Sequence, residues 1–273
     1  MVCAFKGWND AGEAASSAVS FLATALHARR FAAIDSEEFY DFQDNRPCVR
    51  FDESGQREIT WPGVEVLEAL APRAPRDLVL VRGVEPSMRW RAFSSSIVDL
   101  AEALGVQLVV SLGALLGDVP HTRPVALTGH TSDPSLSERL GIASSTYEGP
   151  TGIVGVLHGG CIQAGLPSAS LWAAVPHYVA AAANPSAALA LLRRLEGLIG
   201  VSVDVSELES AAAEYERQVA RAVQSDPDIQ AFVERLEQAT EGAEAAAGQQ
   251  VPSGEALARE FQRFLRQRGD GGR

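Results

Sequence analysis

The sequence is poor in residues that form covalent or metal crosslinks. Its three cysteines are Cys3, Cys48 and Cys161, and their odd number and wide spacing fit neither a disulfide framework nor a zinc site. Sparse cysteine is typical of a reducing compartment, so we expect a cytoplasmic protein. The chain also lacks any apolar run of about 18 residues, which excludes a membrane-spanning helix of ordinary length.

The familiar signatures of catalysis are absent as well. The chain has no G-x-S-x-G nucleophile elbow, no Walker A loop, no H-E-x-x-H zinc motif and no G-x-G-x-x-G dinucleotide turn. The common routes to nucleotide and metal chemistry therefore have no support, and we expect neither a cofactor nor a metal ion. These absences favour a non-enzymatic protein over an enzyme.

Positive charge is scarce. The chain has 23 Lys and Arg residues against 35 Asp and Glu residues, and its net charge is -12. A protein of this charge repels nucleic acid and anionic membranes, so we expect neither as a partner. Hydrophobic residues make up 46% of the chain and charged residues 21%, proportions that favour a folded protein over a disordered one.

Apolar runs and amphipathic segments alternate over residues 1–200, the pattern of strands joined by helices. Right-handed crossovers make most such strands parallel and place helices on both faces of the sheet. The sequence thus predicts an α/β fold. Strands are expected from Val2 and at Phe31–Ile34, Asp77–Arg82, Gln107–Leu112, Val125–Thr128 and Ser168–Ala174, with a hairpin of Val49–Asp52 and Arg57–Trp61. Helices are expected from Asp10 to about His27 and at Arg91–Leu104, Thr151–Gly165 and Ser186–Leu198.

The composition changes after Val203. Residues 204–244 hold eleven acids and three bases, on two amphipathic helices that Asp226 and Pro227 separate. We expect a core domain over residues 1–203 and a C-terminal helical extension over 204–273. An Ala/Gly/Gln-rich stretch at 241–252 predicts a mobile link, and Ser253 would then cap a last helix.

Four loops follow the expected strands, at Gly7–Asp10, Gly83–Pro86, Gly113–Pro124 and Val175–Tyr178. The carboxyl ends of parallel strands share one edge of a sheet, and ligands gather there. We therefore expect these loops to meet at one cleft. Its candidate binding residues are Trp8, Asn9, Asp10, Glu85, Asp118, His121, Arg123 and His177.

Each candidate has a functional and a structural interpretation. Asn9 and Asp10 stand at a helix start, where backbone N–H groups can hold an anion. Alternatively Asp10 caps that helix, with Glu13 completing a capping box. Glu85 can act as a general acid or base, or form an ion pair with a nearby arginine. Trp8 can supply a stacking wall.

Three of the remaining candidates, Asp118, His121 and Arg123, lie in one loop that Pro120 and Pro124 stiffen. His121 can transfer protons near neutral pH, and Arg123 can bind a carboxylate or phosphate through two hydrogen bonds. The structural alternative is a rigid loop in which Asp118 and Arg123 pair with each other. His177 follows a strand and remains open to either role.

Two further histidines receive a structural interpretation. His158 and Cys161 share a helix face at spacing i, i+3. Two ligands do not make a zinc site, so we expect a packed core pair. His130 follows Gly129 and is expected in a loop.

Several longer segments carry a family resemblance. They are GWNDAGEAA at Gly7–Ala15, WPGVEVL at Trp61–Leu67, RGVEPSMRWRAF at Arg82–Phe93, LGALLGDVPHTRPV at Leu112–Val125 and the long run from Tyr147 to Val179. With these motifs the chain resembles the proteasome assembly chaperone family, in the bacterial branch similar to the second of those chaperones. The composition and this branch imply an actinobacterial source.

The resemblance implies a three-layer α/β/α sandwich like that of nucleoside phosphorylases and hydrolases. It also implies a homo-oligomer, for which a trimer is our hypothesis, and protein partners such as 20S proteasome α-subunits. Related chaperones can insert a hydrophobic-Tyr-X ending into α-ring pockets. This chain ends in Gly-Asp-Gly-Gly-Arg, so we do not expect insertion of that kind.

Two alternatives to a chaperone-like oligomer stay open. A small-molecule enzyme or ligand-binding protein would use the cleft at the carboxyl ends of the strands, with Glu85, His121 and Arg123 as its polar groups. A purely structural interaction module would use none of them.

Overall fold

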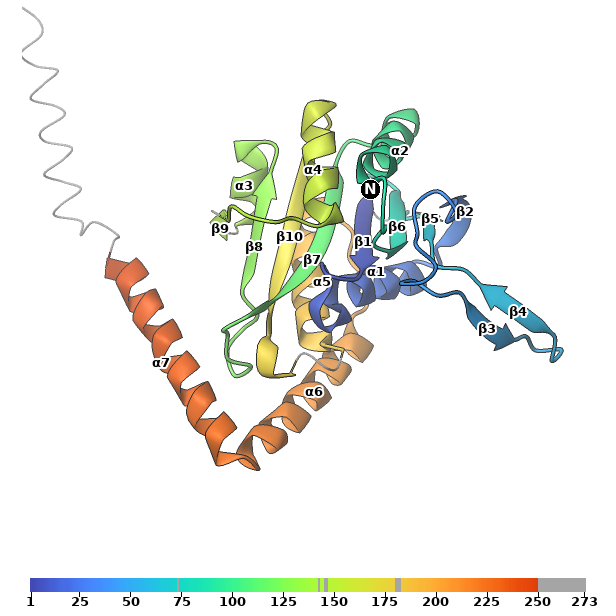
Figure 1. Ribbon diagram of the computed structural model, residues 1–273. Coiled ribbons are helices and arrows are strands. Elements are labelled where there is room, and N and C mark those ends of the chain that lie inside the picture. The colour runs from blue at the N-terminus through green and yellow to red at the C-terminus, as the bar shows by residue number, and fades with distance from the viewer. Residues whose placement is uncertain (73, 142, 145–146, 180–182, 250–273) are drawn as a thin grey trace, which may run out of the picture. The chain divides into compact units, whose positions relative to one another are not determined.

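The computed structural model describes residues 1–249 apart from 73, 142, 145–146 and 180–182. The chain forms two compact units. The first is Met1–Ser225 and contains the central sheet (Figure 1). The second begins at Asp226, and its described element is helix α7 (Pro227–Gln249). The predicted helix after Ser253 lies outside the described residues.

The strands of the central sheet are β1 (Val2–Lys6), β2 (Arg29–Ile34), β5 (Val64–Ala69), β6 (Leu78–Val84), β7 (Val109–Gly117), β8 (Leu127–Thr131), β9 (Ala143–Ser144) and β10 (Ser168–Pro176). Within the described residues they form one eight-stranded sheet in the order β2-β5-β6-β1-β7-β10-β8-β9. The central strands β6, β1, β7 and β10 run parallel. Strand β5 pairs antiparallel with β2 and β6, and β8 pairs antiparallel with β10.

Helices cover both faces of this sheet (Figure 1). Helices α1 (Ala14–Ala25) and α5 (Pro185–Ile199) pack on one face, and α2 (Trp90–Ala103) and α4 (Ile153–Gln163) pack on the other. A shorter helix, α3 (Pro134–Leu140), contacts β8 and α5. The predicted three-layer α/β/α sandwich with a mostly parallel sheet is confirmed.

Strand β1 shows why the fold has two cores. Its side chains alternate between the two faces of the sheet. Val2 and Ala4 belong to the core under α1 and α5, whereas Cys3 and Phe5 belong to the core under α2 and α4. All four are fully buried, because a central parallel strand is covered on both faces.

Strand β5 is an element that the sequence analysis does not predict. It pairs with β6 over Val64–Ala69, and its approach depends on Gly83. A Cβ at Gly83 would lie 2.1 Å from the carbonyl oxygen of Gly63, so only glycine permits this contact. The pairing is set by residues distant in sequence, which a local pattern does not reveal.

The predicted hairpin is confirmed as β3 (Cys48–Phe51) and β4 (Arg57–Thr60). Every residue of both strands is exposed, and the hairpin extends away from the central sheet (Figure 1). Val49 pairs with Ile59, and Phe51 pairs with Arg57. Because side chains alternate along a strand, Val49, Phe51 and Ile59 share one face with Arg57. We call the face that these three apolar side chains form the apolar hairpin face.

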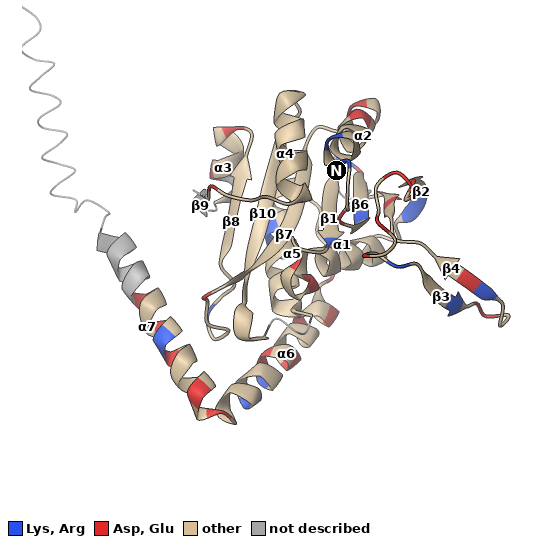
Figure 2. Cartoon of the chain, viewed as in Figure 1, with Lys and Arg blue, Asp and Glu red and all other residues tan. Residues whose placement is uncertain are grey.

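Helix α6 (Ser206–Gln224) packs against α5 and adds Leu208 and Ala212 to the core. Acidic side chains outnumber basic ones along α6 and α7 (Figure 2). Helix α7 continues to Gln249 and so includes the first part of the stretch 241–252, whose mobility stays a prediction. In the described part of the chain, no helix is long and apolar enough to cross a membrane.

Candidate functional site

The carboxyl ends of β6, β1, β7 and β10 lie at one edge of the sheet, so the four strand-exit loops share that edge. The turn after β1 lies beside β7, where the carbonyl oxygen of Asn9 accepts a hydrogen bond from the Ala114 N–H at 2.7 Å. Strand β7 continues to Gly117 before its own loop begins. The candidate residues therefore form two groups, Trp8, Asn9, Asp10 and Glu85 in one, and Asp118, His121, Arg123 and His177 in the other.

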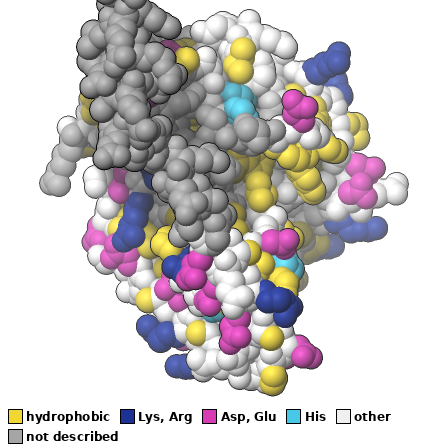
Figure 3. All heavy atoms as spheres, turned by 90° about the vertical axis from the view of Figure 1, so that its left-hand side faces the viewer, with side chains coloured by type: hydrophobic (Ala, Val, Ile, Leu, Met, Phe, Trp, Pro, Cys, Tyr) yellow, Lys and Arg dark blue, Asp and Glu magenta, His cyan; other side chains and the backbone are white. Residues whose placement is uncertain are grey.

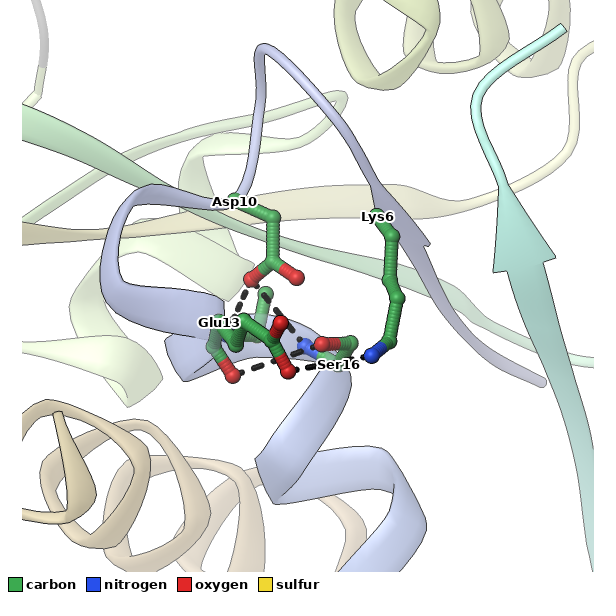
Figure 4. A network of polar contacts seen from close by, with 5 residues as sticks. Lys6, Asp10, Glu13 and Ser16 are labelled. Carbon is green, nitrogen blue, oxygen red and sulfur yellow. Dashed lines mark hydrogen bonds and ion pairs between the residues drawn. The ribbon is translucent and has the colours of Figure 1, made fainter. Parts of the chain in front are cut away.

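In the first group, Asp10 caps α1 (Figure 4). Its Oδ1 accepts hydrogen bonds from the backbone N–H groups of Ala15 at 2.8 Å and Ser16 at 3.2 Å. Burial raises the pKa of the Asp10 carboxyl, and the hydrogen bonds from Ser16 and Ala15 oppose that rise. The capping-box prediction for Glu13 is wrong, because its carboxylate pairs with Lys6 Nζ at 3.0 Å instead.

Glu85 and Asn9 form a second, part-buried contact beside this turn. Glu85 Oε1 accepts a hydrogen bond from Asn9 Nδ2 at 2.6 Å and another from the Ile153 N–H at 2.8 Å. Ile153 is the first residue of α4, so the Glu85 carboxylate caps that helix and complements its dipole. Arg89, one of the arginines expected to pair with Glu85, pairs with Glu38 instead.

Gly152 allows this arrangement. A Cβ at Gly152 would lie 2.0 Å from Asn9 Oδ1, so any larger residue would displace the Asn9 side chain. Asn9 itself is 1% exposed. The β1 turn, the end of β6 and the start of α4 are thus held together by Asn9, Glu85 and Gly152.

The second group gathers at the ends of β7 and β10. Tyr178 Oη accepts the His121 N–H at 2.7 Å and lies 2.8 Å from His121 Nδ1. Asp118 Oδ1 lies 3.1 Å from His177 Nδ1, so Asp118 pairs with His177. A cavity of about 540 Å³ beneath this loop is lined by His121 and Arg123, together with Arg193 from α5.

A larger cavity, of about 920 Å³, lies on the sheet face that carries α4. Its floor consists of side chains from β8 and β10, and its wall is α4. The turn after β1 and residues 147–151 form its mouth. Its lining includes Trp8, Asp10, Leu115, Thr128, His130, Tyr147, Thr151, His158, Ser170 and Trp172. We call it the α4 cavity.

Most polar residues of the α4 cavity were not among the sequence candidates. His130 lies in β8, so its predicted place in a loop is wrong. His158 lines the cavity and lies 3.1 Å through Nδ1 from Ser168 Oγ. Burial, with a smaller effect from His130, lowers the pKa of His158, so its ring is neutral at pH 7. The missed signal is a period-two pattern of Thr128 with His130 on β8, matched by Ser170 and Trp172 on β10.

The two buried cysteines do not form a reactive site, and the third, Cys48, is exposed on β3, away from the strand-exit edge. Cys3 and Cys161 are buried, and burial raises the pKa of the Cys3 thiol to about 12 and that of Cys161 to about 11. Both thiols are therefore protonated at neutral pH and poor nucleophiles. Among the described residues, no group of three His, Cys, Asp or Glu side chains is arranged to hold a metal ion.

The fold and this edge define a three-layer α/β/α protein in which the turns after β1 and β6 are held by helix-capping side chains and the core is extended by α6. The model of the PAC2 family matches residues 4–223, and the chain belongs to this family. The resemblance to the proteasome assembly chaperone family is thereby confirmed. A search of curated proteins gives no match.

Solved structures agree with this assignment. A PAC2 family protein from Streptomyces avermitilis is 52% identical, with 85% of this chain and 98% of that chain covered and a TM-score of 0.80. A proteasome-assembly chaperone homologue from Mycobacterium tuberculosis is 43% identical over the same shares, with a TM-score of 0.78. An archaeal proteasome activator from Pyrococcus furiosus is 18% identical, covers 82% of this chain and 93% of its own, and shares the fold at a TM-score of 0.65.

Proposed function

We propose that this protein is a non-enzymatic, chaperone-like homo-oligomer that binds protein partners, among them 20S proteasome α-subunits. The PAC2 membership and the 43% identical proteasome-assembly chaperone homologue support this role. We further propose a trimer in the cytoplasm of an actinobacterial cell, with residues 204–273 as a C-terminal helical extension of the 1–203 core.

The apolar hairpin face is the observation on which the proposal depends. Val49 is 47% exposed, Phe51 73% and Ile59 49%, and Trp61 at the end of β4 is 50% exposed. A two-stranded hairpin is at best marginally stable alone in water, and clustered exposed apolar side chains mark interaction surfaces. A protein that covered this face would stabilise the hairpin and bury its aromatic groups.

The carboxylates at the strand-exit edge also favour binding over catalysis. Asp10 and Glu85 each accept backbone hydrogen bonds from a helix start. A general acid or base has to reach the proton that it transfers, whereas these two carboxylates are engaged with the backbone of α1 and α4. Asp10 and Glu85 thus hold the starts of α1 and α4 in place at the edge of the sheet.

The test compares the two faces of the hairpin in the full chain. Phe51→Ser with Ile59→Ser removes apolar groups from one face. Arg50→Ser with Glu58→Ser, a cross-strand pair on the opposite face, serves as the matched control. Light scattering after size exclusion gives the oligomer mass. Mass spectrometry after affinity capture from a proteasome-bearing actinobacterium identifies α-subunits or their precursors.

We expect an oligomer and α-subunit enrichment for the parent and the control, and a loss of one or both in the Phe51/Ile59 variant. A monomeric parent chain would contradict self-association. An oligomeric parent that captures no α-subunit would contradict the proteasome-related role while leaving the hairpin as a self-association surface.

A ligand-binding protein is the second candidate, and the α4 cavity favours it. The cavity is larger than the one beneath the His121 loop. Binding of a small molecule there is compatible with protein binding through the hairpin, because the hairpin contributes no residue to the lining.

A further inference from the structure

The α4 cavity has the size of a small-molecule site. Its volume of about 920 Å³ lies in the upper part of the roughly 300–1,000 Å³ range of ligand pockets. Helix α4 covers β7 and β10 but leaves the neighbouring face of β8 open to the cavity. In the view toward that side of the molecule, hydrophobic side chains gather close to histidine (Figure 3). The space is large enough for a whole molecule rather than for one side chain of a partner.

Aromatic rings form the apolar walls of the cavity. Trp172 lies on Gly113, where a Cβ would come within 2.6 Å of the indole ring, so the backbone of β7 fixes that ring in place. Trp8 and Tyr147 stand at the mouth and are 68% and 63% exposed. Exposed aromatic groups that gather at the mouth of one cavity mark a binding site.

The polar groups of the cavity lie together on the same face. His130 pairs with Ser170 across β8 and β10, and Thr128 pairs with Trp172. From α4, His158 adds a neutral imidazole. These hydroxyl and imidazole groups can each donate or accept a hydrogen bond. A polar ligand atom over this floor therefore finds several partners within one small area.

The charge of the lining selects the sign of the ligand. Asp10 and Glu13 are acidic, and none of the described lining residues is Lys or Arg; Lys6, which pairs with Glu13, lies outside the lining. The cavity beneath the His121 loop has more bases than acids, with Arg123, Arg193 and Arg194 against Glu216 in its lining. A cavity with carboxylates and no base repels phosphates and carboxylates and accepts neutral or cationic molecules.

We infer that the α4 cavity binds a small neutral or cationic molecule that carries an aromatic ring. The ring stacks against the indole and phenol walls of Trp8, Tyr147 and Trp172. The hydroxyl or amine of the ligand meets the floor formed by Thr128, His130 and Ser170. This ligand site is separate from the apolar hairpin face and does not depend on the proteasome-related role.

The test uses sets of compounds that share one ring and carry side groups of different charge. Tryptamine is the cation, indole-3-ethanol the neutral compound and indole-3-acetate the anion. Tyramine with 4-hydroxyphenylacetate, and adenosine with AMP, repeat the comparison on other rings. Calorimetry on the full chain measures each affinity. We expect the anion of each set to bind at least about tenfold more weakly, since one charge pair at a partly buried site is worth more than 1.4 kcal/mol.

Two substitutions in the lining test whether the compounds bind in the α4 cavity. Trp8→Ala removes an exposed stacking wall without disturbing the core, and Trp61→Ala on the hairpin is its matched control. Thr128→Arg adds a positive charge to the floor. We expect Trp8→Ala to weaken binding of every ring compound, Trp61→Ala to leave it unchanged, and Thr128→Arg to shift the preference toward the anions.

The proposal is overturned if none of the ring compounds binds at millimolar concentration. It is also overturned if the anions bind as tightly as their neutral and cationic counterparts. Binding that neither Trp8→Ala nor Thr128→Arg alters would place the ligand elsewhere and would equally overturn it. The Phe51/Ile59 variant keeps full ligand affinity under this proposal, so failure of the hairpin role and failure of the ligand site are distinguishable.

Discussion

Carboxylates withdrawn from water are costly unless hydrogen bonds compensate for the lost water, and both the buried Asp10 and the part-buried Glu85 obtain such bonds at helix starts. Asp10 binds the first turn of α1 with Oδ1, and Glu85 binds the first residue of α4. The negative end of each side chain therefore meets the positive end of a helix dipole. At the scale of single residues, the polar residues of the turn after β1 are explained by their contacts with helix starts. Asp10 binds the start of α1, and Asn9 binds Glu85 at the start of α4.

The pH dependence of stability should report the burial of Asp10. Burial raises the pKa of this carboxyl above 3.8, its ordinary value, so the folded protein holds the proton more tightly than the unfolded chain. Stability that Asp10 contributes is then lost as pH rises from 3.8 through the raised pKa. Asp10→Asn keeps an Oδ1 acceptor for Ala15 and Ser16 but carries no charge.

We expect the unfolding free energy of Asp10→Asn, relative to the parent, to increase as pH rises through that window and to level off above it. Urea unfolding of both proteins at a series of pH values measures the difference. Glu13→Gln is the control, because Glu13 is exposed and its ion pair with Lys6 is at the surface. A difference that stays flat across the window would contradict a raised Asp10 pKa.

At the scale of elements, the start of α4 depends on close approach rather than on a capping side chain of its own. Gly152 is its N-cap and makes no side-chain hydrogen bond. Its missing Cβ leaves the space that Asn9 fills. Gly159, inside the same helix, has open space where a Cβ would be. The packing therefore requires glycine at position 152 but not at position 159.

Substituting these two glycines should therefore change stability in opposite directions. Gly152→Ala forces Asn9 out of its contact with Glu85 and should lower the unfolding free energy by about 1–3 kcal/mol. Gly159→Ala adds a helix-favouring residue without a clash and should raise it by about 0.5–1 kcal/mol. Chemical denaturation of both variants measures the changes. Equal effects of the two substitutions would contradict the close packing of Gly152 on Asn9.

Local sequence patterns predict some elements of the fold and miss others. Continuous apolar runs indicate β1, β6, β7 and β10, and Asn184 before Pro185 indicates the start of α5, where Asn184 Oδ1 accepts from the Ala187 N–H at 2.9 Å. Strand β5 is missed because its partner β6 and the contact at Gly83 are fixed by the fold. The Asp10 cap follows from the preference for Asp at helix starts. The capping box does not form, because the Asp10 N–H donates to the Gly7 carbonyl oxygen and the Glu13 carboxylate pairs with Lys6.

The α4 cavity is harder to find from sequence for a physical reason. Its floor joins Thr128 and His130 from β8 with Ser170 from β10, and those strands pair only after the antiparallel return of β8. A strand expected to be buried on both faces should carry few hydroxyls, so Ser170 next to apolar Leu171 is the signal that one face is open. The rule that ligands gather at the carboxyl ends of parallel strands predicts a single cleft at the strand-exit loops, whereas residues of these loops line two separate cavities.

At the scale of the whole molecule, the division of the chain bears on what the C-terminal helices do. Residues 1–225 form one compact unit, and α6 completes its core by burying Leu208 and Ala212 against α5. The helical extension that we propose from residue 204 is then not uniform. Its first helix is a structural part of the sandwich, and its second, α7, belongs to a separate unit.

Two truncations should separate these parts. A chain ending at Ser225 keeps both cores and should unfold at nearly the same denaturant concentration as the full chain. A chain ending at Val203 exposes the α5 surface and loses the buried Leu208, which costs about 1.5–3 kcal/mol. It should therefore unfold at a clearly lower denaturant concentration. If both truncated chains unfold at the same denaturant concentration as the full chain, α6 adds nothing to the core and the domain boundary lies near residue 203. If the chain ending at Ser225 is itself destabilised, the second unit stabilises the first.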